Sequence, residues 1–234
     1  MKALLINGSP RPNGCTFTAL TELANTLEAE GIETEIVHVG NKDIRGCIAC
    51  RRCHSTGSNK CVFDDIVNEV APKLAEADAF VIGAPVYFGS PAGGAISFMD
   101  RLFFSTLNID KTMKVGASVV TCRRGGNTAS YDVLNKYFTM CGMPVASSQY
   151  WNMVYGGSAE EVKKDAEGLQ TMRHPWPQHG LFDEEYPDRQ ATDRPARKRT
   201  CCLHKLPSLR KCSIFLLLCC RESRDGNVPA FPFS

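Results

Sequence analysis

The sequence predicts an α/β fold with a five-stranded parallel sheet between two layers of helices. Short apolar runs rich in β-branched residues alternate with amphipathic segments, which is the pattern of successive βαβ units. No internal repeat interrupts this alternation. The 234 residues are 43% hydrophobic and 22% charged with a net charge of +2, values typical of a globular domain and unlike collagen or highly charged disordered chains.

Five strands are expected where the apolar runs occur, at residues 3–6, 34–39, 79–83, 115–120 and 145–149. Helices are expected between them, at residues 17–30, 65–76, 91–104 and 128–141. A last helix should begin at Ser158, where Ser-Ala-Glu-Glu forms a capping box. In such a box the serine oxygen accepts the amide of Glu161, and the Glu161 side chain reaches back to the serine amide.

The character of the chain changes after Arg173. Residues 1–173 contain 17 Lys and Arg and 18 Asp and Glu, whereas the last 61 residues contain 10 Lys and Arg and 7 Asp and Glu. The last part also contains seven of the 13 prolines and five cysteines without ligand-like spacing. We expect residues 1–173 to form the folded domain and residues 174–234 to be a disordered tail.

Charge and segment lengths also limit the partners. The nearly balanced charge argues against nucleic acid, a membrane surface or a polyanion, and favours a small partner. The apolar runs at residues 1–6 and 214–220 are too short for a signal peptide or a bilayer span. We therefore expect a cytoplasmic protein, whose twelve cysteines are read as thiols or metal ligands before disulfides.

Three loops follow predicted strands, at the sheet edge where doubly wound folds bind ligands. The first, residues 7–16, combines Ser9, Arg11 and Thr16 with the amides of a helix start, which are the groups that bind phosphate. It has neither a P-loop lysine nor a G-x-G-x-x-G fingerprint. A plain turn with a helix cap is the alternative reading.

The second and third loops are suited to a flat ligand. Residues 83–94 place Tyr87 and Phe88 before glycines, although two such aromatics equally suit a core or an interface. Residues 121–128 place Arg123 and Arg124 before glycines, where they can meet cofactor phosphates or form an ordinary solvated face.

Four cysteines form the strongest metal motif. The spacing C-x2-C-x2-C-x7-C favours an iron-sulfur cluster over zinc, which usually takes two separated cysteine pairs. A third reading is a set of free thiols, favoured by neighbouring basic side chains. The four candidate ligands are Cys47, Cys50, Cys53 and Cys61.

These motifs together resemble the flavodoxin-like NADPH-dependent FMN reductase and iron-sulfur flavoprotein family. The resemblance covers residues 1–173 and rests on Leu-Leu-Ile-Asn-Gly-Ser-Pro-Arg at 4–11, the four-cysteine loop, Pro-Val-Tyr-Phe at 85–88 and Arg-Arg-Gly at 123–125. It implies a flavodoxin-like fold, bound FMN, a 4Fe-4S cluster on the four cysteines, and a homodimer or homotetramer with the flavin near a subunit interface. It further implies transfer of electrons from NAD(P)H, as co-substrate, to a quinone, flavin or iron-sulfur acceptor.

The resemblance also assigns site residues. The FMN phosphate would be held by Ser9, Arg11, Asn13, Cys15 and Thr16. The flavin ring would be flanked by Pro85, Val86, Tyr87, Phe88, Gly89, Thr121, Arg123, Arg124, Gly125 and Gly126. Cys15 stands where asparagine is common in the family. No catalytic side chain is required, because FMN carries the redox chemistry. The rival functions are a non-enzymatic flavin or iron-sulfur electron carrier and a thiol or zinc regulatory module.

The chain departs from the family at the end of this region. Relatives continue the last helix with a run resembling Leu-Gly-Arg-Asn-Met-Ala, whereas this chain reads Pro-Trp-Pro-Gln-His-Gly at 175–180. Prolines cannot continue a helix interior. Codons for this stretch, read from their second base, can encode the family's run, so we hypothesise a frameshift near Arg173.

Overall fold

A computed structural model describes residues 1–174 of the chain, and the description below is confined to them. Five parallel strands lie in the order β2-β1-β3-β5-β6, which is the flavodoxin-like strand order. They are β1 (Lys2–Asn7), β2 (Glu33–His38), β3 (Ala79–Tyr87), β5 (Val115–Cys122) and β6 (Met153–Tyr155). The predicted fold class is confirmed.

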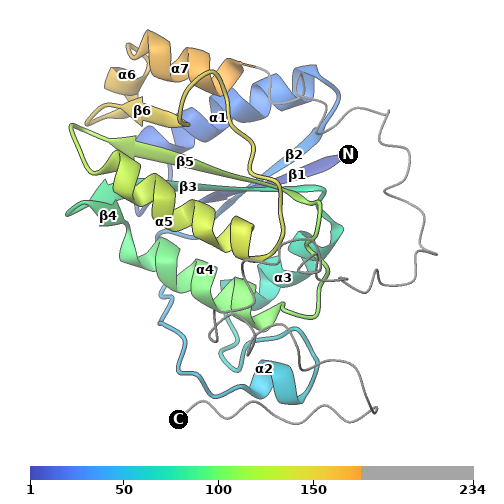
Figure 1. Ribbon diagram of the computed structural model, residues 1–234. Coiled ribbons are helices and arrows are strands. Elements are labelled where there is room, and N and C mark those ends of the chain that lie inside the picture. Colours follow the sequence, from blue (N-terminus) through green and yellow to red (C-terminus); the bar gives the residue numbers. More distant parts are fainter. Residues whose placement is uncertain (175–234) are drawn as a thin grey trace, which may run out of the picture. The chain divides into compact units, whose positions relative to one another are not determined.

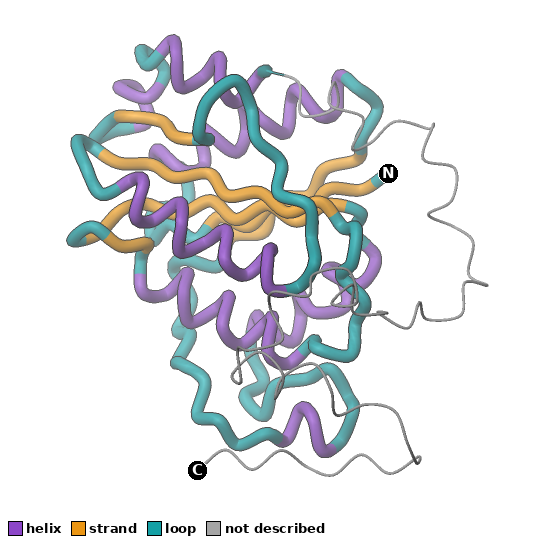
Figure 2. Tube along the Cα trace, in the orientation of Figure 1, coloured by secondary structure: helices purple, strands orange, loops and turns teal. Residues whose placement is uncertain are grey.

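Helices cover both faces of the sheet (Figures 1 and 2). One face carries α1 (Cys15–Ala29), α6 (Ala159–Val162) and α7 (Ala166–Arg173), and the other carries α3 (Ile66–Glu76), α4 (Gly93–Ser105) and α5 (Asn127–Met140). Alternate residues of the central strands supply the two cores: Leu4 and Ile6 face one, Leu5 faces the other. Burial on both faces explains why these strands read as continuous apolar runs.

The third strand is longer than expected and ends in a hairpin. Beyond residue 83 it continues to Tyr87 and pairs antiparallel with the short β4 (Ser90–Pro91), which the sequence did not predict. Phe88 and Gly89 form the turn with φ values of +51° and +81°. Pro91 consequently belongs to the hairpin, and α4 starts only at Gly93.

The predicted strand at residues 145–149 was wrong. Val145 makes one isolated bridge to Gly116 at the beginning of β5, and the fifth parallel strand is β6, which pairs with the end of β5. Both segments are short and apolar, so the hydrophobic pattern alone did not separate them. The chain leaves the sheet between the two pairings and rejoins it where the amide of Val120 donates to the carbonyl of Asn152.

The last predicted helix begins at Ser158 but is divided into α6 and α7. The Ser158 hydroxyl accepts the Glu161 amide at 3.3 Å, as the capping box predicts. The Glu161 carboxylate, however, accepts the amide of Gly157 at 2.7 Å and not that of Ser158. Asp165 then caps α7 by accepting the Gly168 amide.

One further short helix, α2 (Arg52–Ser55), lies in the cysteine loop and was not predicted. Among residues 1–174, no helix has the length and apolar character needed to cross a membrane. The predicted tail beyond His174, with its five cysteines and the proposed frameshift, lies outside the described residues.

Candidate functional site

The three loops predicted to carry chemistry meet at the carboxyl edge of the sheet. The Gly8 amide donates to the Gly83 carbonyl at 2.8 Å, which joins the first loop to the second. A Cβ on Gly126 would lie 2.7 Å from the Cα of Gly89, so the third loop packs directly on the hairpin. The first and third loops are connected by a hydrogen bond between the Thr16 and Thr121 hydroxyls. Segments distant in the sequence therefore build one continuous edge.

Buried polar side chains fix the shape of the first loop. The Asn7 side chain accepts the Ser9 amide and donates to the Pro12 carbonyl, both at 3.1 Å. The Ser9 hydroxyl accepts the Arg11 amide at 3.2 Å. Ser9 and Thr16 are buried under the loop, so their structural role is to hold its backbone in place.

A hollow with a volume of about 340 Å³ lies over this loop at the start of α1. Arg11, Asn13 and Cys15 line it, as the sequence predicted for the phosphate site. Helix α1 begins at Cys15, is preceded by Gly14 at the N-cap position with no capping side chain, and has no acidic residue in its first turn. Its first amides and the positive end of its dipole are thus open to an anion such as a phosphate group.

The opposite wall of the hollow was missed from the sequence. It consists of Ser158, Ala159 and Glu160 at the start of α6. The Cys15 thiol donates to the Gly156 carbonyl at 3.5 Å and so connects the two walls. Burial raises the pKa of Cys15, which keeps the thiol neutral beside the hollow. The capping box predicted that a helix starts at Ser158, but it could not predict that this helix start lies opposite Cys15 of the first loop.

The residues predicted to flank a flavin ring differ in exposure. Thr121 is buried, whereas Arg123, Arg124 and Gly125 are exposed, Gly126 is half-buried and α5 starts at Gly126 without a capping side chain. In the hairpin, Pro85 and Val86 are half-buried, Tyr87 is 48% exposed, and Phe88 and Gly89 are fully open to solvent. Two large aromatic side chains at the sheet edge thus have little to pack against within the described chain.

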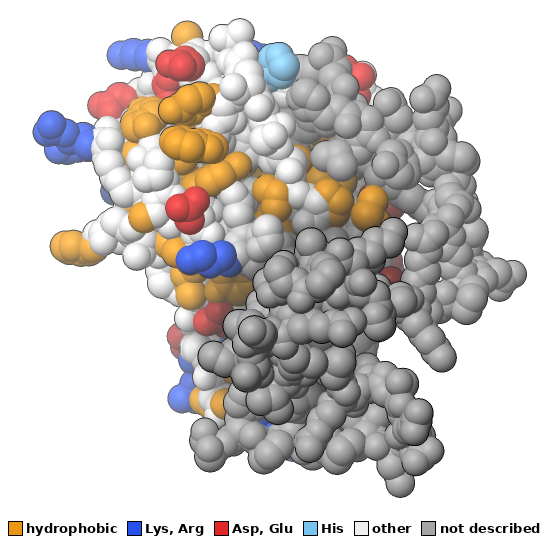
Figure 3. Space-filling view, viewed as in Figure 1, with side chains coloured by type: hydrophobic (Ala, Val, Ile, Leu, Met, Phe, Trp, Pro, Cys, Tyr) orange, Lys and Arg blue, Asp and Glu red, His pale blue; other side chains and the backbone are white. Residues whose placement is uncertain are grey.

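More apolar surface lies beside this edge. Figure 3 shows hydrophobic side chains gathered over β6 and the loop before it, where Tyr150, Trp151 and Tyr155 are exposed. The rings of Tyr150 and Trp151 lie 5.2 Å apart. The Asn127 side chain donates to the Tyr155 hydroxyl and, at 2.9 Å, to the Met153 sulfur, which fixes the start of α5 against β6.

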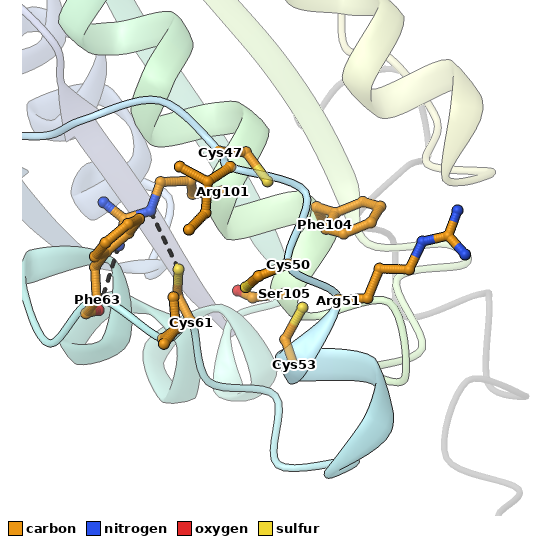
Figure 4. Close-up of a pocket in the computed structure, with 11 residues that line it drawn as sticks. Cys47, Cys50, Arg51, Cys53, Cys61, Phe63, Arg101, Phe104 and Ser105 are labelled. Carbon is orange, nitrogen blue, oxygen red and sulfur yellow. Dashed lines mark hydrogen bonds between the residues drawn. The ribbon is translucent and has the colours of Figure 1, made fainter. Parts of the chain in front are cut away.

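The four predicted metal ligands line a second pocket, on the helix α3 and α4 side of the sheet (Figure 4). All four are free cysteines: Cys47 and Cys50 are exposed, Cys61 is half-buried, and Cys53 is buried, which raises its pKa. Arg101 and Phe104 of α4 complete the wall. No role was predicted for Arg101, although a lone arginine in an apolar helix was a usable signal.

Within residues 1–174, no group of three His, Cys, Asp or Glu side chains is placed to hold a metal ion. The donor set nevertheless fits the predicted group, because four thiols that line a single pocket are the soft ligands of iron-sulfur clusters and of zinc.

Known proteins are similar to this chain in sequence or in fold. The family model of NADPH-dependent FMN reductases matches residues 1–157. An iron-sulfur flavoprotein of Methanocaldococcus jannaschii is 34% identical over 181 residues, which cover 74% of this chain and 93% of that protein. An iron-sulfur flavoprotein of Methanosarcina thermophila is 29% identical, with 74% of this chain and 90% of that protein covered.

Solved structures show the same fold at low sequence identity. RosB, whose structure contains a bound 8-demethyl-8-formylriboflavin-5'-phosphate, is 17% identical with a TM-score of 0.58, and the match covers 99% of this chain and all of that one. The azoreductase AzrA is 14% identical with a TM-score of 0.51, covering 74% of this chain and 97% of that one. At these identities the likeness shows the fold alone.

Proposed function

The chain belongs to the NADPH-dependent FMN reductase family and is an FMN-dependent oxidoreductase, and from this premise we propose that it oxidises NAD(P)H and delivers the electrons to a quinone, flavin or iron-sulfur acceptor. One observation carries the proposal: an uncapped helix start borders a hollow over the first loop, and the second and third strand-end loops contact that loop or each other at the same edge of the sheet. A dehydrogenase of the Rossmann type would need a glycine fingerprint that this first loop does not contain.

In this proposal the first loop holds the FMN phosphate. The amides at the start of α1 donate to the phosphate, and the Arg11 guanidinium supplies a charge-assisted contact. Asn13 and Cys15 line the same hollow, while Ser9 and Thr16 act from beneath by fixing the loop. Ser158, at the start of α6, adds a hydroxyl from the opposite wall.

The second and third loops would enclose the flavin ring. FMN held there would supply the redox chemistry between reduced nicotinamide and the acceptor. The protein's part is to orient the ring with the backbone between Pro85 and Gly89 and between Thr121 and Gly126, and to exclude water with Tyr87 and Phe88. No side chain acid or base is assigned.

We further propose that Cys47, Cys50, Cys53 and Cys61 bind a 4Fe-4S cluster. Their common pocket and the iron-sulfur flavoproteins among the relatives support this assignment. Zinc is the alternative occupant, because it also prefers thiolates.

The test is anaerobic purification followed by visible spectra before and after addition of NADH or NADPH. Iron, sulfide and zinc are quantified in the same sample. We expect a flavin spectrum that bleaches with one of the two nucleotides, together with stoichiometric iron and sulfide. Flavin that is reduced only by a ferredoxin-type donor would identify a non-enzymatic carrier and defeat the reductase proposal. Stoichiometric zinc without flavin would identify a regulatory module instead.

A further inference from the structure

Arg101 is a buried charge in the wall of the cysteine pocket. Its side chain is 0% exposed, although it lies on α4 among Phe98, Leu102 and other core residues. A buried guanidinium is tolerated only when its donors are satisfied and its charge is compensated. The partners of this side chain therefore show what it does.

Four of the five hydrogen bonds of the Arg101 side chain connect it to neighbouring segments of the chain. Nη1 and Nη2 donate to the two carboxylate oxygens of Asp65, at 2.6 and 2.9 Å. Nη2 also donates to the Phe63 carbonyl at 3.3 Å, and Nη1 to the Arg45 carbonyl at 3.4 Å. Asp65 is fixed in turn, because it caps α3 by accepting the Val67 amide. This fork positions the guanidinium rigidly.

The fifth contact points into the cysteine pocket. Nε donates to the Sγ of Cys61 at 3.3 Å, and Figure 4 shows this bond. With the fork occupied by Asp65, the Nε–H is left for the sulfur. This contact directs a charge-assisted donor at a sulfur that the proposed cluster would use as a ligand.

The backbone of Cys61 is fixed as well. The Asn68 side chain accepts the Cys61 amide at 2.7 Å and donates to the Cys61 carbonyl at 3.1 Å. By contrast, Cys47 and Cys50 are exposed on a loop whose residues Ala49 and Arg51 have positive φ. Cys61 is thus held at both its backbone and its sulfur, unlike Cys47 and Cys50.

We propose that Arg101 is a positioning residue for the cysteine centre: held by Asp65, it fixes the Cys61 sulfur in place as a ligand of that centre. This inference rests on the proposed cluster. A hydrogen bond to a ligand sulfur favours the more negative, reduced state, so Arg101 also raises the reduction potential of the centre. A purely structural arginine would join α3 to α4 without affecting that potential.

Two variants separate these roles. Arg101→Lys keeps the charge, but one ammonium cannot serve both Asp65 oxygens and the Cys61 sulfur in this geometry. The double variant Arg101→Met with Asp65→Asn removes the buried pair together and keeps α3 capped, because asparagine caps helices as well as aspartate does. Leu102→Ala is the matched control, since Leu102 is buried on the same helix and does not line the pocket.

The proteins are reconstituted anaerobically with iron and sulfide. The readouts are iron and sulfide per chain, the rate of cluster loss to a chelator, and the reduction potential from a dye titration; circular dichroism confirms folding. We expect wild type and Leu102→Ala to retain the cluster. Both Arg101 variants should lose it about 10- to 100-fold faster and show a more negative potential.

If the double variant folds and matches wild type in cluster retention and potential, the inference on Arg101 is overturned while the cluster assignment stands. A wild-type protein that takes up no cluster overturns both. If Arg101→Lys does not fold, the double variant, in which no buried charge is left unpaired, decides the result.

Discussion

The hydroxyl oxygens of Thr16 and Thr121 lie 2.9 Å apart, in contact across 105 residues of sequence. Thr16 is in the first turn of α1 and Thr121 is near the end of β5, and both are buried. Their hydrogen bond joins the loop proposed to bind the FMN phosphate to the loop proposed to flank the flavin ring.

The bond should appear as energetic coupling between the two residues. Thr16→Val or Thr121→Val alone leaves one buried hydroxyl without its partner, which costs about 1–3 kcal/mol of unfolding free energy. The double variant removes both hydroxyls at nearly constant shape, so its loss should be smaller than the sum of the two single losses. Urea unfolding of the four proteins measures this cycle. Strictly additive losses would show that the two hydroxyls do not interact.

Arg11 is expected to contribute to the affinity for FMN through its phosphate. Arg11→Met removes a charge-assisted contact from an exposed position, so we expect FMN to bind about tenfold more weakly. Riboflavin, which has no phosphate, should bind both proteins equally. Fluorescence titration of the apoprotein measures both ligands, with Lys136→Met on the surface of α5 as the control. An equal loss for riboflavin would contradict a phosphate contact.

The sequence was most informative about the central strands. Residues such as Leu4, Leu5 and Ile6 are buried on both sides of the sheet, and a continuous apolar run between turn signals is a strong local signal. The prediction of the fifth strand failed because the pairing with β5 is divided between Val145 and the strand that begins at Met153. No local sequence pattern encodes such an interruption.

The site was predicted as three separate loops, and the structure supplies their neighbours. Arg11 and Cys15 were assigned from a loop that joins a strand to a helix, whereas Ser158 was recognised only as a helix cap. Its place opposite Cys15 depends on how α6 packs against α1, which is a tertiary contact. Arg101 was missed for the same reason, because its proposed role depends on hydrogen bonds to Cys61 and Asp65, which lie 40 and 36 residues away in the sequence.

The contact between the hairpin and the third loop should tolerate no added methyl group. At Gly126 a Cβ would lie 2.7 Å from the Gly89 Cα and the backbone has a φ of +89°, so Gly126→Ala should cost at least about 1–3 kcal/mol and weaken FMN binding. Gly46→Ala is the matched control, because a Cβ there meets nothing within 4 Å and Gly46 lies outside the loops proposed to bind FMN. Thermal unfolding and FMN titration compare the two variants. Equal behaviour would show that the packing at Gly126 does not shape the site.

Ionisation of the Cys15 thiol should lower the affinity for FMN at high pH. Burial raises the pKa of Cys15 above its ordinary value of 9.0, so the thiol is neutral at pH 7 to 8 and adds no repulsion to the phosphate. As the pH rises through this raised pKa, a thiolate forms beside the bound anion and the affinity should fall. FMN binding also favours the neutral thiol, which moves the loss to still higher pH in the complex.

Cys15→Ser tests this directly, because a serine hydroxyl does not ionise in this range. We expect the variant to bind FMN as wild type does at pH 7.5 and to keep its affinity above pH 9, where wild type weakens. Titrations from pH 7 to 10.5, with unfolding monitored at each pH, provide the measurement. A parallel decline in both proteins would place the titrating group elsewhere and remove Cys15 from the wall of the phosphate site.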